Sequence, residues 1–273
     1  MRTRTISLIA VALVLLLPSG AQAEPSWAPA DQATVHPGVQ TFTDGSQCTA
    51  NFVFFDANDD IYVGQAAHCA GTGGATETNG CDSGSMPLGT TVELDGADAP
   101  GTLVYSSWLT MQARSESDEN ACEYNDFALI KLDPLDYDNV NPSVPFYGGP
   151  TAVGAPSSLG DNVYSYGNSG LRFGFSPLSP KEGYSLGQHA DGWSHDVYTA
   201  TPGIPGDSGS AFLSPTGAAL GTLSTVAILP FPASNGVGDL ARELDYARQF
   251  GGFNDLQLAL GTEAFVAGVL PAP

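Results

Sequence analysis

The sequence Gly206-Asp207-Ser208-Gly209-Ser210 places a serine between an acid and a glycine, within a short glycine-bracketed segment. Glycine lets the backbone turn sharply, so this serine can be presented at the tip of a turn. A hydroxyl nucleophile needs a base that accepts its proton, and the base needs a carboxylate that orients it. Such a segment also occurs by chance in a chain with 33 glycines, so other segments must supply the base and the acid.

Two further segments contain such groups. Gln65-Ala66-Ala67-His68-Cys69 follows the apolar run Ile61-Tyr62-Val63. Asn125-Asp126 leads directly into the apolar run Phe127-Ala128-Leu129-Ile130. Taken alone, a histidine beside a cysteine is usually structural, and an aspartate before an apolar run is usually a turn residue. The three segments together predict nucleophilic catalysis.

Each residue of this set has a chemical role that its type can fill. Ser208 is the expected nucleophile, and His68 is the expected base that takes its proton and later gives it to a leaving group. Asp126 is expected to hold the other ring nitrogen of the imidazole and to fix its tautomer. The backbone N–H groups of Gly206 and Ser208 are expected to form an oxyanion hole, a contribution of roughly 3–4 kcal/mol per donor.

The three segments resemble the motifs of the chymotrypsin-like serine proteases, and more closely those of their secreted bacterial relatives. Ala66–Cys69, Asn125–Ile130 and Gly206–Ser210 carry the resemblance, in the family's order of His, Asp and Ser. Subtilisins have the order Asp, His, Ser, and α/β-hydrolases have Ser, Asp, His. The resemblance covers about residues 39–250 and implies an all-β fold of two antiparallel six-stranded β-barrels of the chymotrypsin type, followed by a C-terminal helix.

The resemblance also implies roles for residues near the serine. Ser224, in the segment Gly221-Thr222-Leu223-Ser224, would contact the substrate backbone. Asp207 would be a structural acid, which in many relatives pairs with a freshly cut N-terminal amine. No activation sequence is evident near His36-Pro37-Gly38-Val39, and no basic residue precedes it. We therefore expect donors inside the chain to satisfy Asp207, without zymogen cleavage.

The substrate pocket departs from the trypsin pattern. In the family, the residue six positions before the nucleophile often sets specificity, and here that residue is Pro202, followed by Gly203. Pro202 and Gly203 are therefore the expected pocket residues. No acid stands there to hold an arginine or lysine side chain, so a small or apolar side chain is expected before the cut bond.

Composition independently favours a turn-rich β protein. The chain has 33 Gly and 20 Pro, and both residues break helix interiors. Short runs rich in β-branched and aromatic residues alternate with turn signals. The expected strands are 51–55, 61–63, 91–94, 103–105, 127–132, 162–166, 197–200, 210–213 and 220–228. One helix is expected, capped by Asp239 and ended by Gly251, and segments 72–90 and 113–125 are expected to be surface loops.

The charge of the chain limits its partners. The formal net charge is −21, which excludes a typical nucleic-acid partner, because phosphate binding rests on Lys and Arg. The expected partner is a protein or peptide substrate, and the chain is expected to be a monomer. No cofactor and no metal are expected, because His36, His189 and His195 lack the spacing of metal ligands. We expect His189 and His195 to lie in a solvated surface loop.

Residues 1–23 have the features of a secretory signal peptide. Arg2 and Arg4 precede the apolar run Ile6–Leu17, and Ala21-Gln22-Ala23 forms a small-x-small cleavage site. The run is shorter than the ~18–20 residues that span a bilayer, which argues against the alternative of an uncleaved anchor. We expect an extracellular protein with a leader or short propeptide at 24–38. The protease domain would be 39–273, with the boundary between barrels near 147–157.

Four cysteines in an exported chain favour two disulfides. Three pairings are possible, and we favour Cys48–Cys69 with Cys81–Cys122. The first would close a loop worth roughly 3 kcal/mol, and a bridge beside the histidine is also a feature of the family that the chain resembles. A zinc site is the competing interpretation, weakened because no two cysteines have the short spacing of metal sites.

Two functions from different classes fit these observations. The first is a secreted serine endopeptidase that works through an acyl-enzyme. The alternative is a catalytically inactive chymotrypsin-fold module that is secreted and binds other molecules. The complete set of His68, Asp126 and Ser208 favours the enzyme, because a binding module has no need of all three. An esterase is a subsidiary option, since acyl-enzyme chemistry also accepts esters.

We predict that the chain, expressed in an exporting host, is recovered outside the cell with Glu24 as its first residue. Signal peptidase cleaves after a small-x-small sequence, so residues 1–23 should be lost. N-terminal sequencing and intact mass measure the outcome. A membrane-bound product that keeps its apolar run would establish the anchor instead.

Overall fold

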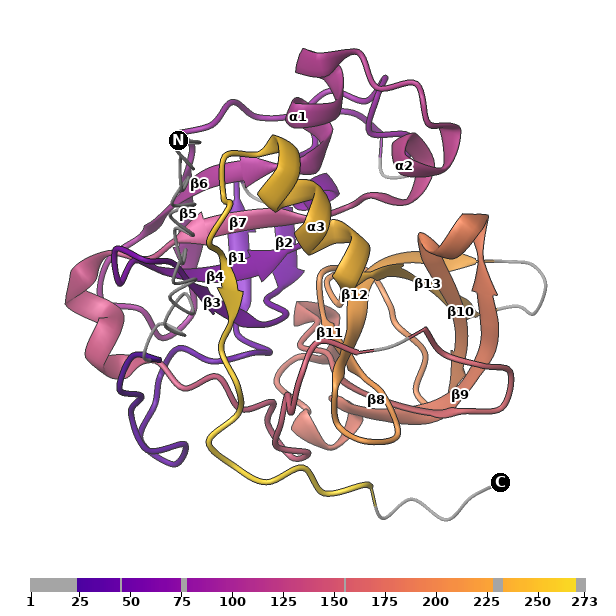
Figure 1. Ribbon diagram of the computed structural model, residues 1–273. Coiled ribbons are helices and arrows are strands. Elements are labelled where there is room, and N and C mark those ends of the chain that lie inside the picture. The colour runs from indigo at the N-terminus through magenta and orange to yellow at the C-terminus, as the bar shows by residue number, and fades with distance from the viewer. Residues whose placement is uncertain (1–23, 45, 75–77, 155, 228–232, 269–273) are drawn as a thin grey trace, which may run out of the picture.

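Two antiparallel sheets and a helix near the C-terminus form the structure, a computed structural model (Figure 1). It describes residues 24–44, 46–74, 78–154, 156–227 and 233–268. The predicted signal peptide therefore lies outside the described residues. Within the described ranges, no helix is long and apolar enough to cross a membrane.

The N-terminal sheet is open and has eight strands in the order β14-β3-β4-β7-β6-β5-β1-β2. Its strands are β1 (Gln40–Thr43), β2 (Ser46–Thr49), β3 (Val53–Phe55), β4 (Ile61–Gln65), β5 (Thr91–Leu94), β6 (Gly101–Ser106), β7 (Ala128–Lys131) and β14 (Gln257–Leu258). The expected all-β class is confirmed. The expected closure into six strands is not found among the described residues: this sheet is open, and β14, from the far end of the sequence, adds to its edge at β3.

The C-terminal sheet closes into a six-stranded barrel in the order β10-β13-β12-β11-β8-β9. Its strands are β8 (Asn162–Tyr166), β9 (Pro180–His189), β10 (Ser194–Thr199), β11 (Ala211–Leu213), β12 (Ala219–Ala227) and β13 (Ser234–Asp239). Six buried apolar side chains fill the barrel: Val163, Val197, Phe212, Leu220, Leu223 and Val237. The barrel therefore has a core of its own.

The two expected disulfides are both present. Cys48–Cys69 joins β2 to the short helix η1, which contains His68. Cys81–Cys122 joins a loop to the helix α2. The competing zinc interpretation is wrong for these cysteines, because their sulfurs are bonded to each other.

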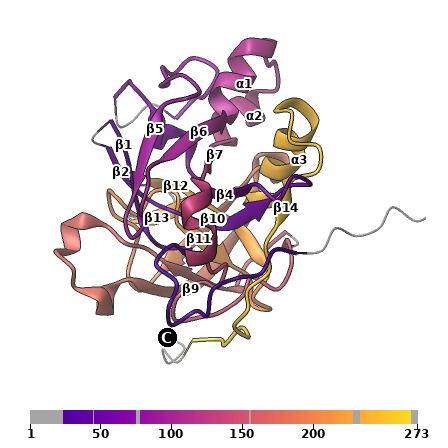
Figure 2. The same cartoon turned by 90° about the vertical axis from the view of Figure 1, so that its left-hand side faces the viewer.

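The expected helix is α3 (Leu240–Phe250). The side chain of Asp239 accepts a hydrogen bond from the backbone N–H of Arg242 and caps it, and it ends at Gly251 as predicted. Leu244 and Ala247 are fully buried in a core between the two sheets. Figure 2 shows α3 beside the N-terminal sheet, with β14 following it along that sheet's edge.

The expectation of a surface loop at 113–125 is wrong. Two short helices, α1 (Ser107–Arg114) and α2 (Glu119–Tyr124), occupy this region. Asp118 caps α2, and Trp108 and Met111 anchor α1 in the core. The shorter 3-10 helices are η1 (Ala67–Ala70), η2 (Pro134–Asn139), η3 (Gly170–Arg172), η4 (Ser176–Leu178) and η5 (Ala190–Gly192).

His195 is also placed differently from the expectation. It lies on β10 and is fully buried, whereas a solvated loop was expected. Its two ring nitrogens are 2.9 Å from Ser157 Oγ and 2.9 Å from Asp239 Oδ2. The imidazole therefore joins the barrel to the cap of α3. His189, at the end of β9, is more than a third exposed.

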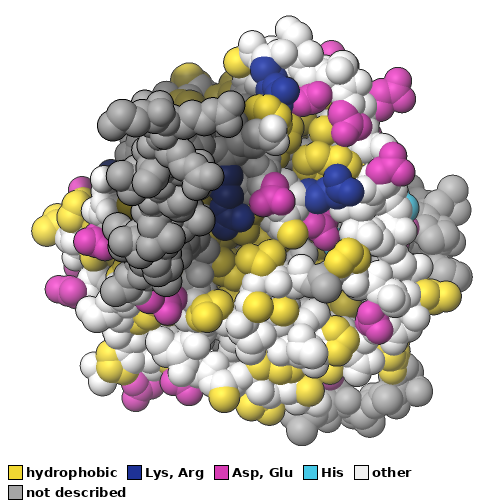
Figure 3. Space-filling view, in the orientation of Figure 1, with side chains coloured by type: hydrophobic (Ala, Val, Ile, Leu, Met, Phe, Trp, Pro, Cys, Tyr) yellow, Lys and Arg dark blue, Asp and Glu magenta, His cyan; other side chains and the backbone are white. Residues whose placement is uncertain are grey.

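Residues 24–38 run along the N-terminal sheet. Trp27 contacts Phe55 edge to face, with ring centroids 6.4 Å apart, and Val35 is fully buried and bridges Val140. The acidic side chains of the protein are spread over the face shown in Figure 3, with few basic ones among them. Some charged side chains are nevertheless buried, and among them are Asp126, Asp207 and Lys181 of the site described next.

Replacing Leu244 with Ala tests the core between the sheets. The substitution removes a fully buried side chain, so the free energy of unfolding should fall by about 2–5 kcal/mol. Urea unfolding with the disulfides intact measures the change. Gln249→Ala, on the exposed face of the same helix, is the matched control and should change stability by less than about 0.5 kcal/mol. Equal effects of the two substitutions would contradict this packing.

Candidate active site

The pairing of β4 with β7 brings His68 and Asp126 to the same edge of the N-terminal sheet. Gln65 is paired with Ala128, so the residues just after β4 and just before β7 are neighbours. His68 Nδ1 lies 2.6 Å from Asp126 Oδ2, and the backbone N–H of His68 donates to Asp126 Oδ1 at 2.8 Å. A carboxylate at Nδ1 keeps a proton there and leaves Nε2 as an acceptor.

The electrostatics of this pair oppose its burial. Burial lowers the pKa of His68, but the charge and the hydrogen bond of Asp126 outweigh it, and the pKa ends above the ordinary 6.5. Burial likewise raises the pKa of Asp126, but the charge and hydrogen bond of His68, with a bond from Ser224, hold it below 3.8. The carboxylate therefore stays ionised where the imidazole titrates.

Ser224 connects the barrel to this pair. It lies on β12 at an irregularity in the pairing with β13, between Leu223 and Thr225. Its Oγ donates to Asp126 Oδ2 at 2.5 Å. The sequence predicted a contact with the substrate backbone for Ser224, and the structure adds a hydrogen bond that positions the acid.

Ser208 lies on a tight turn against the N-terminal sheet. Its carbonyl accepts from the N–H of Thr49 at 2.8 Å, and the N–H of Gly209 donates to Leu223 O at 2.7 Å. Gly209 has φ +88°, and a Cβ there would lie 2.5 Å from Thr49 O and 3.0 Å from Ala66 N. Only glycine fits, so the serine turn is held against the segment that leads to His68.

The side chains of Ser208 and His68 are not hydrogen-bonded to each other in the described part of the chain. His68 is half-buried, with a quarter of its side chain exposed, and Ser208 is also half-buried. Catalytic hydrogen bonds are often long in free enzymes and tighten when substrate binds. The structure thus places His68 in direct contact with Asp126. It places Ser208 at the same edge of the N-terminal sheet.

The two amides expected in the oxyanion hole have no partner within the part of the chain that the structure describes. Among the described residues, neither the N–H of Gly206 nor that of Ser208 donates to a protein acceptor. The carbonyl of Gly206 points to β2, where it accepts from Thr49 Oγ1 at 2.7 Å and from Gln47 Nε2 at 2.9 Å. Gly206 has φ +94°, which favours glycine at this position.

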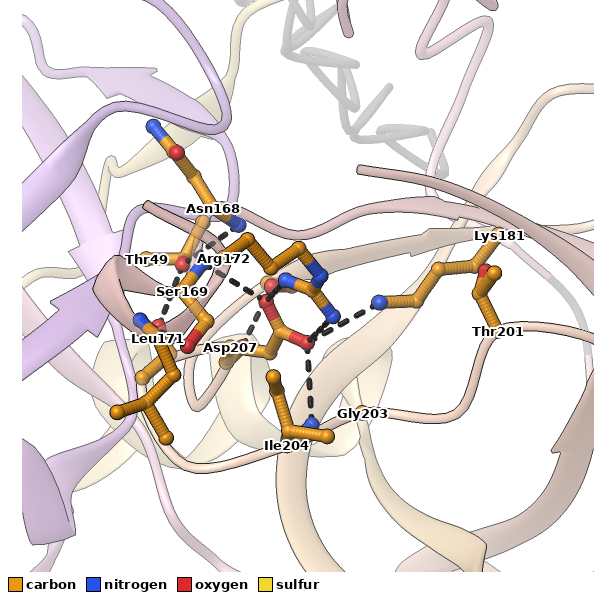
Figure 4. A network of polar contacts seen from close by, with 12 residues as sticks. Thr49, Asn168, Ser169, Leu171, Arg172, Lys181, Thr201, Gly203, Ile204 and Asp207 are labelled. Atoms are coloured by element: carbon orange, nitrogen blue, oxygen red, sulfur yellow. Dashed lines mark hydrogen bonds and ion pairs between the residues drawn. The ribbon is translucent and has the colours of Figure 1, made fainter. Parts of the chain in front are cut away.

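Asp207, between these two amides, is fully buried and has five internal donors (Figure 4). Both oxygens receive a guanidinium nitrogen of Arg172 at 2.5 Å, and Lys181 Nζ lies 3.1 Å from Oδ2. The backbone N–H groups of Ser169 and Ile204 donate at 3.0 and 3.1 Å. Arg172 and Lys181 approach the carboxylate from different sides, so its negative charge faces two cations.

The charges of this cluster shift its pKa values. Burial raises the pKa of Asp207, but the hydrogen bonds of Arg172 and the charge of Lys181 outweigh it and lower the pKa. Burial lowers the pKa of Lys181, and the charge of Arg172 adds to that effect, against the attraction of Asp207. The acid is therefore ionised and internally neutralised.

Sequence reasoning missed Arg172 and Lys181, and also Glu243. Glu243 lies on α3, is fully buried, and accepts a bond from Thr222 Oγ1 at 2.8 Å. Burial, with the negative charges of Asp126 and Asp239, raises its pKa well above the ordinary value. One feature of the sequence could have indicated Arg172 and Lys181. Only six basic residues follow residue 23, so a buried acid has few possible basic partners.

Pro202 and Gly203, the expected pocket residues, precede the serine turn. The carbonyl of Pro202 lies 3.5 Å from Lys181 Nζ, and the N–H of Gly203 donates to a side chain on β13. Both residues therefore lie between the Asp207 cluster and β13.

Comparison with known proteins identifies the architecture. No protein-family model matches the chain, and no curated protein sequence matches it. Protease A of Thermobifida fusca superposes with a TM-score of 0.52 over 83% of this chain and 99% of its own, at 16% identity. A Nocardiopsis protease gives a TM-score of 0.48 over 82% and 98%, at 17% identity. The chain has the chymotrypsin-type fold, and the solved structures that it resembles are bacterial chymotrypsin-like serine proteases.

An NMR titration of the His68 imidazole tests the pair. The midpoint in the wild type is expected above 6.5, because the carboxylate of Asp126 favours the imidazolium. In Asp126→Asn the charge is lost while burial remains, so the pKa of His68 should fall below the wild-type value. Ser224→Ala keeps the carboxylate and is the control, with a midpoint still above 6.5. Equal midpoints in the wild type and Asp126→Asn would argue against the pairing.

Proposed function

We propose that the chain is a secreted serine endopeptidase that hydrolyses peptide bonds through an acyl-enzyme. The observation that carries the proposal is the His68–Asp126 pair, 2.6 Å apart, at the edge where the serine turn is held. The chymotrypsin-type fold supports it, because a solved structure that shares this fold, that of Protease A of Thermobifida fusca, is a protease. His68, Asp126 and Ser208 are the proposed catalytic residues.

Acylation starts when Ser208 Oγ attacks the carbonyl carbon of the peptide bond. His68 Nε2 takes the hydroxyl proton as the new C–O bond forms, and Asp126 stabilises the resulting imidazolium. The carbonyl oxygen becomes an oxyanion, which accepts from the free amides of Gly206 and Ser208. The C–N bond then breaks, and the imidazolium gives its proton to the leaving amine.

Deacylation repeats these steps with water. His68 takes a proton from the water as its oxygen attacks the ester carbon of the acyl-enzyme. The second tetrahedral intermediate uses the same oxyanion hole. It collapses with return of the proton to Ser208 Oγ, which restores the enzyme and releases the carboxylic acid. Because the base must be neutral, kcat/KM should rise as the pH is raised through the pKa of His68, above 6.5.

Asp207 is the proposed structural acid of this enzyme. Its five internal donors take the place of a new N-terminal amine, which supports activity without zymogen cleavage. The two disulfides support an extracellular location. Residues 1–23 are the proposed signal peptide, 24–38 the leader, and 39–273 the protease domain, active as a monomer on protein or peptide substrates.

A secreted binding module without activity is the second candidate. The observation that favours it is the missing hydrogen bond between Ser208 and His68 among the described residues. An inactive module would keep the fold and the His68–Asp126 pair, but its serine would not be activated. The reactivity of Ser208 therefore distinguishes the two candidates.

Labelling with a fluorophosphonate probe tests the proposal on disulfide-intact protein that begins at Glu24. The wild type should be labelled, and Ser208→Ala should lose the label and at least about 10⁴-fold of kcat on peptide substrates. Ser158→Ala, at an exposed serine, is the control and should be labelled like the wild type. A correctly folded wild type that stays unlabelled would favour the binding module. Labelling only after a further N-terminal cut would refute activity without processing.

A further inference from the structure

We infer that Asn235 closes the space beside Ser208 and restricts the residue before the cut bond to glycine or alanine. The inference rests on the proposed function, because it assigns a substrate class to the proposed active site. It goes beyond the expectation of a small or apolar side chain, because it excludes large apolar side chains and names the residue that excludes them.

Two backbone segments flank the serine turn on the barrel side. One is Pro202–Pro205, which leads directly into the turn. The other is Leu223–Thr225 on β12, which is tied to the turn by the bond from Gly209 N–H to Leu223 O. We place the side chain of the acyl part of a substrate bound at Ser208 between these two segments, because the N-terminal sheet lies on the other side of the turn, at Thr49.

The side chain of Asn235 already spans that space. Asn235 lies on β13, is fully buried, and stands opposite Val226 of β12. Its Oδ1 accepts from the N–H of Gly203 at 2.9 Å, and its Nδ2 donates to the carbonyl of Thr225 at 3.2 Å. One amide thus joins both flanking segments through their backbones.

The contacts around Gly203 show that the closure is also steric. A Cβ on Gly203 would lie 2.8 Å from Asn235 Nδ2 and 2.9 Å from Leu223 Cδ2. The amide and the leucine therefore occupy the volume next to the Cα of Gly203, so this part of the space is filled. A large substrate side chain would have to displace the amide, and the buried N–H of Gly203 and C=O of Thr225 would lose their partner.

The charged groups around this space do not favour a basic substrate side chain. The nearest buried acid on the Pro202 side is Asp207, and its oxygens are taken by Arg172, Lys181 and two backbone N–H groups. Lys181 Nζ also faces the carbonyl of Pro202 at 3.5 Å. An arginine or lysine entering here would meet a cation and no free carboxylate.

Two substrates that differ only in the residue before the cut bond measure the preference for a small side chain. We expect the wild type to cleave a peptide nitroanilide with Ala before the bond at least about 100-fold better in kcat/KM than the same peptide with Phe. Asn235→Ala removes the amide that fills the space, so kcat/KM for the Phe substrate should rise at least about 10-fold relative to kcat/KM for the Ala substrate. The preference for Ala should therefore fall by about the same factor.

Asn162→Ala is the matched control. Asn162 is exposed on β8 of the same barrel, and its substitution should leave the preference unchanged. A wild type that cleaves after Phe or Leu as well as after Ala would overturn the inference, as would an unchanged preference in folded Asn235→Ala. If that variant does not fold, the cleavage sites that the wild type selects in a peptide library, read by mass spectrometry, decide between small and large side chains.

Fluorophosphonate labelling of the same wild-type preparation separates the two possible failures. A labelled enzyme with no preference for small side chains overturns the role of Asn235 and leaves the proposed function standing. A folded protein that is neither labelled nor active overturns both.

Discussion

The site depends on one buried carboxylate that both sheets supply with donors. Asp126 accepts two hydrogen bonds from His68, which follows a strand of the N-terminal sheet, and one from Ser224 of the barrel. A buried carboxylate is costly unless it is paired, so its position fixes the positions of its donors. The hydrogen bonds to Asp126 therefore fix how the two sheets lie relative to each other. They also fix the position of the serine turn.

A second buried carboxylate holds the serine turn from the opposite side. Asp207 is neutralised by Arg172 and Lys181, two of the few basic residues of a very acidic chain. Removing one partner of such a pair typically costs more than replacing the whole pair with apolar groups, because a charge is left unpaired. The chain thus places two of its few cations where the positions of Gly206 and Ser208 must be fixed. Burial and two nearby carboxylates raise the pKa of Glu243 well above its ordinary value.

Sequence patterns predicted the parts of the molecule that are locally encoded. The segments 53–55, 61–63 and 128–130 are continuous apolar runs, and the capping residue and the terminating glycine of α3 are standard signals. The strands β9 and β13 are rich in glycine and polar residues, and their extended form comes from pairing with β8, β10 and β12. The partners of Asp207 and the bonds of Asn235 join residues far apart in sequence, so only the assembled barrel brings them together.

The pairing of β14 with β3 has a consequence for how the N-terminal sheet is completed. Phe54 and Phe55 lie on a strand that receives Leu258 and Gln257 as its outer neighbour. Without those two residues this strand is an unpaired edge, which is a template for aggregation. The N-terminal sheet is therefore completed at this edge only by the C-terminal part of the chain, and a chain that lacks residues 257 and 258 would leave the edge open to pairing with other chains.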